Sequence, residues 1–136
     1  MRIFLDANML FSAAKSDGAV RALVHLLVDG GHECRVDDFV VTEARRNLGA
    51  KGGEAMAAFE ALLPYFKCGS MSRPLPDSEL LDWLPEKDRP VLAAAMRLQC
   101  DALVTGDRTH FGCAYAKVFG GVTIHSPRSM ADGLPA

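Results

Sequence analysis

A short apolar segment that ends in a carboxylate constrains this chain more than any other feature. Ile3, Phe4 and Leu5 are consecutive large apolar residues, and Asp6 follows them directly. Such a run is typical of a strand that is buried on both faces, as in a parallel sheet. Because an apolar interior cannot leave a carboxylate unpaired, we expect Asp6 at the carboxyl end of the strand, where open α/β sheets hold their ligands.

The composition is that of one ordinary globular domain. The chain has 136 residues, of which 49% are hydrophobic and 24% charged, so we expect a single domain over residues 1–136 and no global disorder. The formal net charge is −2. Binding to nucleic acid would therefore depend on a local basic patch rather than on the overall charge.

The cysteines and the first residues predict a cytoplasmic protein. Cys34, Cys68, Cys100 and Cys113 are widely spaced and form no C-x-x-C pair, which favours reduced thiols over a zinc site or a disulfide framework. Asp6 interrupts the apolar start too early for a secretory signal. No later segment reaches the length that spans a membrane, so no membrane association is expected.

Strands and helices are predicted to alternate along the chain. Strands are expected at 3–5, 33–36, 67–71, 102–105 and 122–124, and helices at 17–29 after Ser16 as N-cap, at about 39–48, at 54–66, as a short turn at 79–84, and at 89–98 after Asp88. A loop is expected at 73–77 and a polar tail after the last strand. This alternation predicts an α/β fold with a mainly parallel sheet that is covered on both faces.

Four carboxylates far apart in the sequence are predicted to meet at one edge of this sheet. Asp6 and Asp107 each follow a buried strand. Asp88 begins a helix that must run antiparallel to the strands and therefore starts at their carboxyl edge. Glu43 lies about two turns into a helix that leaves the same edge. Asp101, at the beginning of its strand, is expected at the opposite edge.

Carboxylates gathered in one cleft repel each other, so they require protons or a cation. Mg²⁺ prefers oxygen ligands in octahedral geometry, and Mn²⁺ suits the same ligands. Two such ions roughly 3.5–4 Å apart would orient an attacking water and stabilise the leaving oxygen of a phosphodiester. The acids therefore indicate metal-assisted phosphodiester hydrolysis.

The ordered set of acidic motifs resembles a PIN domain. It consists of Phe4-Leu5-Asp6-Ala7-Asn8, then Glu43, then the segment that begins Asp88-Arg89-Pro90, then Leu103-Val104-Thr105-Gly106-Asp107. The resemblance implies a three-layer α/β/α fold with a mainly parallel five-stranded sheet, and a Mg²⁺- or Mn²⁺-dependent endoribonuclease. At this size the chain is similar to VapC-type toxins, which implies an antitoxin protein as partner and a homodimer.

The resemblance also implies a role for individual residues. Asp6, Glu43, Asp88 and Asp107 would be the catalytic, metal-binding acids, and Asn8 and Thr105 supporting polar residues that hold a ligand or water. Apart from the resemblance, Arg108 and His110 lie close to Asp107 in the sequence and could contact phosphates of the RNA substrate. His110 could instead pack beside Phe111. The sequence departs from the family pattern after Asp107, where many relatives place a further acid and this chain has Arg108-Thr109-His110-Phe111. That departure favours one tightly held ion over two.

Other interpretations of the same residues stay open. Asp88 could simply cap its helix, Asp107 could be a turn residue, and Glu43 could pair with neighbouring arginines on the surface. Several cations near the acids could hold phosphates or be ordinary surface charges: Arg45, Arg46, Lys51, Lys87, Arg89 and Arg108. Two other functions remain, namely a non-catalytic module that binds RNA or protein, and a small phosphatase with Asp6 as nucleophile.

Overall fold

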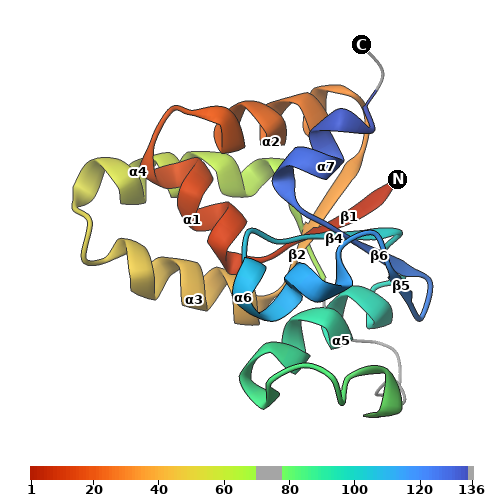
Figure 1. Ribbon diagram of the computed structural model, residues 1–136. Coiled ribbons are helices and arrows are strands. Elements are labelled where there is room, and N and C mark those ends of the chain that lie inside the picture. Colours follow the sequence, from red (N-terminus) through yellow and green to blue (C-terminus); the bar gives the residue numbers. More distant parts are fainter. Residues whose placement is uncertain (70–77, 135–136) are drawn as a thin grey trace.

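A six-stranded sheet forms the centre of the molecule (Figure 1). The structure is a computed structural model, and it describes residues 1–69 and 78–134. The strands are β1 (Arg2–Leu5), β2 (Glu33–Val36), β3 (Lys67–Cys68), β4 (Ala102–Val104), β5 (Val118–Phe119) and β6 (Val122–His125). Their order across the sheet is β3-β2-β1-β4-β6-β5. The first five in this order are parallel, and β5 is antiparallel to β6.

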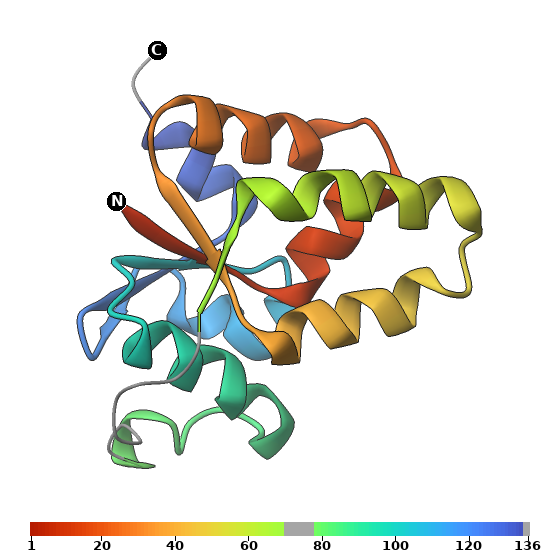
Figure 2. The same cartoon turned by 180° about the vertical axis from the view of Figure 1, so that it is seen from behind.

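Helices cover both faces of the sheet. They are α1 (Ala7–Lys15), α2 (Ala19–Asp29), α3 (Asp38–Leu48), α4 (Gly53–Leu62), α5 (Arg89–Arg97), α6 (Arg108–Phe111) and α7 (Pro127–Asp132), with 3₁₀ turns at Leu63–Tyr65, Ser78–Leu80, Glu86–Asp88 and Gly112–Ala114. In Figures 1 and 2, α2, α4 and α7 lie above the sheet and α5 lies below it. The result is the three-layer α/β/α arrangement that the sequence predicts.

The two central strands explain why the core centres on the first residues. Ile3, Phe4 and Leu5 of β1 have no exposed surface, and neither have Leu103 and Val104 of β4. β1 pairs with β4 in parallel, and Leu5 lies opposite Val104. The residues that follow these two strands therefore leave the sheet at the same level, which brings Asp6 beside Thr105.

The predicted sheet is confirmed, but its strand count is wrong by one. All five predicted strands are present, at slightly different lengths, and they form the parallel part of the sheet. The sixth strand, β5, forms a hairpin with β6 through Gly120 and Gly121, whose φ angles are +55° and +85°. Glycine adopts these left-handed conformations without steric cost, so the turn suits the sequence.

Three helices are absent from the sequence prediction: α1, α7 and the four-residue α6 that follows Asp107. Residues 7–15 form α1, and the following helix begins at Ala19 with Gly18 as N-cap, so Ser16 ends α1 instead of capping the next helix. The predicted polar tail contains α7, which Ser126 begins through a capping box with Ser129. The physical signal for α7 is therefore local, because Pro127 occupies the first turn directly after that serine.

Other helix ends differ by a few residues. The helix expected at 54–66 ends at Leu62 and continues as a 3₁₀ turn that contains Pro64. The end of the strand expected at 67–71 and the loop expected at 73–77 lie outside the described residues. The four cysteines have free thiols. Within residues 1–69 and 78–134, every helix is too short or too polar to cross a membrane.

Candidate metal centre

Asp6 joins the central strand to the first helix. It follows β1 directly, and its backbone N–H donates to the carbonyl of Val104 at 3.1 Å. Its side chain caps α1, because Oδ1 accepts a hydrogen bond from the N–H of Ala7 at 2.7 Å. Its other oxygen, Oδ2, accepts from the Thr105 hydroxyl at 2.8 Å and from the Asn8 amide at 3.2 Å. Both oxygens are thus held by the protein.

The charge on Asp6 is nevertheless costly. The residue is only 6% exposed, and this burial raises the pKa of its carboxyl group from 3.8 to about 6. The hydrogen bonds from Thr105 and Ala7 lower the pKa, whereas the negative charges of Glu43 and Asp107 raise it further. The environment therefore resists deprotonation of Asp6 unless a positive charge is added.

Asn8 and Thr105 connect the ends of β1 and β4. The Asn8 amide donates to the Thr105 hydroxyl at 3.2 Å, and its carbonyl oxygen accepts from the N–H of Gly106 at 2.8 Å. The Thr105 hydroxyl also accepts from the N–H of Asp107 at 3.1 Å. These two residues thus orient Asp6 and Asp107 relative to each other. Thr105 is fully buried and Asn8 is partly exposed.

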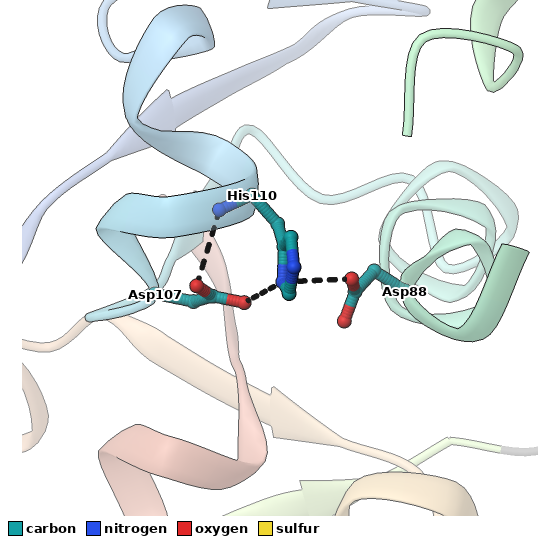
Figure 3. A group of neighbouring side chains, drawn as sticks. All are labelled: Asp88, Asp107 and His110. Atoms are coloured by element: carbon teal, nitrogen blue, oxygen red, sulfur yellow. Dashed lines mark hydrogen bonds and ion pairs between the residues drawn. The ribbon is translucent and has the colours of Figure 1, made fainter. Parts of the chain in front are cut away.

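Asp107, His110 and Asp88 form a second group beside Asp6 (Figure 3). Asp107 caps α6, because Oδ1 accepts from the N–H of His110 at 3.2 Å. The other oxygen of Asp107 lies 2.8 Å from Nδ1 of the same histidine. Oδ2 of Asp88 lies 3.1 Å from that nitrogen. The imidazole ring therefore stands between two carboxylates that belong to different helices.

Asp88 does not act as the helix cap that its sequence position suggests. It occupies the N-cap position of α5, but its backbone is helical and its side chain makes no capping hydrogen bond. Its Oδ2 atom is buried and accepts no hydrogen bond from the residues that the structure describes. The contact to His110 has the distance of an ion pair but not the geometry of a hydrogen bond. Asp88 thus points toward the other acids, and no capping hydrogen bond offsets the free-energy cost of burying its Oδ2 atom.

Glu43 completes one cleft that contains all four acids. The cleft has a volume of about 200 Å³ and its lining is formed by Asp6, Ala7, Asn8, Phe11, Glu43, Asn47, Lys87, Asp88, Val91 and Asp107. Glu43 is partly exposed on α3. Arg45, one of the two neighbouring arginines considered as its partner, instead pairs with Glu60 at 3.1 Å.

The candidate basic residues separate into different groups. Lys87 lines the cleft with the acids, whereas Arg108 lines a neighbouring pocket that also contains Arg128. Arg89 donates to the backbone carbonyl of Leu84 at 3.0 Å and so stabilises the turn before α5. Asp101 accepts a hydrogen bond from the N–H of Arg2 at 2.8 Å. It therefore lies at the amino edge of the sheet, as expected.

A divalent cation fits the chemistry of this cleft. The acids supply hard oxygen ligands, the type that Mg²⁺ and Mn²⁺ prefer. Asp88 Oδ2 is a buried oxygen without a hydrogen-bond donor in the described part of the chain. Burial, and to a smaller extent the neighbouring negative charges, raise the pKa of the Asp6 carboxyl group. One cation would bind the Oδ2 atom of Asp88 and favour the charged form of Asp6. Asp88, Asp107 and His110 also offer ligand atoms that lie within 4.8 Å of one another.

Fold and cleft together define an α/β domain of the class that gathers acidic residues at the carboxyl edge of a parallel sheet. The model of the PIN domain family matches residues 2–109, which include all four acids and Thr105. This match covers most of the 136 residues. The chain therefore belongs to the PIN domain family.

A solved structure shares this fold over nearly the whole chain. It is the crystal structure of VapBC2 from Rickettsia felis bound to a DNA fragment from their promoter. The two chains superpose with a TM-score of 0.63 at 10% sequence identity, over 93% of this chain and 98% of the other. At this identity the likeness shows the fold alone. A search of curated protein sequences gave no match.

Proposed function

We propose that this protein is a metal-dependent endoribonuclease that hydrolyses RNA phosphodiesters. The observation that carries the proposal is the convergence of Asp6, Glu43, Asp88 and Asp107 on one cleft. Membership of the PIN domain family supports it, because the acids fall in the motifs through which the sequence resembles these nucleases. Mg²⁺ or Mn²⁺ would be held by these four carboxylates. When bound, the ion would activate water for attack on phosphorus and stabilise the leaving oxygen.

The chain's own residues would orient the acids and the substrate. Thr105 and Asn8 donate to Asp6 and so hold its carboxylate in place. Lys87 is exposed at the cleft, where its ammonium group could bind a phosphate of the RNA backbone. Both oxygens of Asp6 already accept hydrogen bonds, which disfavours the phosphatase alternative in which Asp6 attacks phosphorus. No protein nucleophile is required.

We further propose that the protein is the toxin of a toxin-antitoxin pair. The support is the shared fold with a chain of the VapBC2 complex and the similar small size. The partner would be an antitoxin protein that inhibits cleavage, and the toxin would form a homodimer. Co-expression with the neighbouring open reading frame tests the pairing. A neighbour that neither binds the protein nor relieves growth arrest would contradict it.

The decisive experiment incubates the purified protein with a mixed RNA pool and Mn²⁺. We expect cleavage that Asp6→Asn and Asp107→Asn both abolish, because each removes a charged ligand. Asp101→Asn is the matched control, since this acid lies at the opposite edge and an amide oxygen can still accept from Arg2. The products should carry 5′-phosphate and 3′-hydroxyl ends. Cleavage that survives in both site variants would point to a contaminant and overturn the assignment.

A non-catalytic binding module is the second candidate. The observation that favours it is the segment Arg108-Thr109-His110-Phe111, which follows Asp107 without the further acid that many relatives place within these few residues. Calorimetry separates the two functions. If millimolar Mg²⁺ or Mn²⁺ neither binds nor raises the melting temperature, the nuclease proposal loses its basis, and retained RNA binding would then favour the module.

A further inference from the structure

The position of His110 is unusual for a residue that only supports an acid. Its Nδ1 atom lies 2.8 Å from Asp107 Oδ2 and 3.1 Å from Asp88 Oδ2. One ring nitrogen can donate at most one hydrogen, so it can satisfy only one of these oxygens at a time. Asp88 Oδ2 is the one left without a hydrogen bond in the described chain. A single proton on Nδ1 therefore cannot satisfy both carboxylate oxygens.

The spacing of these atoms matches a metal ligand set. An octahedral ion with metal–ligand bonds of roughly 2.1 Å keeps neighbouring ligand atoms about 3.0 Å apart. The distances from His110 Nδ1 to the two carboxylate oxygens, 2.8 and 3.1 Å, are close to this value. A cation that replaces the proton would contact all three atoms and supply the partner that Asp88 lacks.

The backbone of α6 fixes the ring at this place. Asp107 Oδ1 accepts from the N–H of His110 at 3.2 Å, so the same carboxylate caps the helix and touches the ring. Phe111, the next residue, is fully buried and packs edge-on against Trp83 at 6.0 Å between ring centroids. The His110 side chain is 26% exposed. The imidazole is therefore held near the two acids while part of it stays exposed to solvent.

We propose that His110 is a ligand of the bound cation, together with Asp88 and Asp107, and that it makes the centre prefer Mn²⁺ to Mg²⁺. This inference rests on the proposed function. Imidazole nitrogen suits transition-metal ions, whereas Mg²⁺ favours carboxylate, carbonyl and water oxygens. A neutral imidazole also brings one negative charge fewer to the ligand set than a carboxylate at the same place would. Both effects weaken Mg²⁺ binding more than Mn²⁺ binding.

Calorimetric titration of the intact chain with each ion tests the preference. We expect His110→Asp to lower the ratio of Mn²⁺ to Mg²⁺ affinity by about tenfold, mainly by strengthening Mg²⁺ binding. His110→Ala should weaken Mn²⁺ binding by about tenfold and change Mg²⁺ binding less. His32→Asn is the matched control, because this histidine contacts the N-terminal amine at 3.1 Å; its ratio should equal that of the wild type.

Electron spin echo spectroscopy of the Mn²⁺-loaded protein provides a direct readout. We expect nitrogen modulation from a coordinated imidazole in the wild type and in His32→Asn, and none in His110→Asp. Circular dichroism of each variant shows whether it is folded. A folded His110→Asp variant with an unchanged affinity ratio and unchanged modulation would overturn the proposal.

The two proposals fail in different ways. If the wild type binds Mn²⁺ and cleaves RNA in an Asp6-dependent manner but shows no nitrogen modulation, the role of His110 is refuted and the nuclease function stands. If the wild type binds neither ion, both proposals are refuted.

Discussion

Asp6 combines three tasks that usually fall to separate residues. It ends the central strand, caps α1 through Ala7, and contributes a carboxylate to the cleft. Three donors stabilise its charged form, while burial and the neighbouring acids oppose that form. Because the opposing effects dominate, the pKa of Asp6 is raised, and its charged form is favoured only at higher pH or when a positive charge is added.

The raised pKa of Asp6 predicts how the stability of the metal-free protein responds to pH. Burial raises the pKa of Asp6 from 3.8 to about 6, so the folded state binds the proton more tightly than the unfolded state. The stabilisation is fully present below pH 3.8 and is lost as the pH rises to about 6. We expect the contribution of Asp6 to the free energy of unfolding to fall by about 3 kcal/mol across this window. Urea titrations in EDTA measure it.

Asp6→Asn isolates this contribution. An uncharged amide cannot titrate, so in this variant the free energy of unfolding should fall much less as the pH rises. Above pH 6 the variant should be as stable as the wild type, or more stable. A variant that is clearly less stable at neutral pH would show that Asp6 acts mainly as a hydrogen-bond acceptor. An unchanged pH dependence would assign the effect to another group.

At the scale of single elements, two aspartates at helix starts contribute differently to stability. Asp37 is buried and caps α3, with Oδ1 accepting from the N–H of Val40 at 3.1 Å. Asp88 stands at the start of α5 without a capping bond. In metal-free protein we expect Asp37→Ala to lower the free energy of unfolding by about 1 kcal/mol, and Asp88→Ala to change it by less than about 0.5 kcal/mol.

Chemical denaturation of both variants in EDTA tests this contrast. Equal losses would mean that Asp88 stabilises the fold through a contact other than a cap. With Mn²⁺ present the order should reverse, because only Asp88→Ala removes a proposed ligand.

The elements that could be predicted are those with a strong local pattern. Residues 33–36 have the predicted bounds as β2 because the Gly30-Gly31 stop and the Asp37-Asp38 start enclose them. The pattern for α1 was present but ambiguous. Asp6 is a good N-cap and Met9, Leu10, Ala13 and Ala14 form one buried face, yet the sequence analysis predicts no helix between Asp6 and Ser16. β5 has only two residues, too few for any periodicity.

The acids of the site could be found from connectivity, but their partners could not. A parallel sheet brings strand ends to one edge, so the positions of Asp6 and Asp107 follow from the order of elements alone. The contact between His110 and Asp88 depends on the orientation of α6 against α5, which no local pattern specifies. The spacing of Asp107 and His110, three residues apart on a helix, was the available signal.

At the scale of the whole molecule, an acidic protein would have to bind the proposed RNA substrate through a few local cations. The net charge is −2, and Lys87 is the cation that lines the cleft within the described part of the chain. For single-stranded RNA each phosphate contact contributes about 0.7 to the slope of log affinity against log salt. We expect Lys87→Ala to weaken binding in EDTA and to reduce the slope by about this amount.

Lys67→Ala is the control for this measurement. Lys67 belongs to β3, the outermost strand on one side of the sheet, does not line the cleft, and pairs with Glu33 at 2.6 Å, so its removal should leave the slope unchanged. Equal effects of the two variants would show that RNA does not enter through the cleft.

The pairing of β1 with β4 has a consequence for the order of folding. Leu5 and Val104 lie opposite each other although they are 99 positions apart in the 136-residue chain, and such distant contacts form only after a costly loop closure. Asp6 and Asp107 therefore become neighbours late. A cation that needs both would find no binding site in the unfolded chain and little of one before this closure. The bound cation would therefore stabilise the folded state but not the transition state for folding. It would slow unfolding and leave the folding rate unchanged.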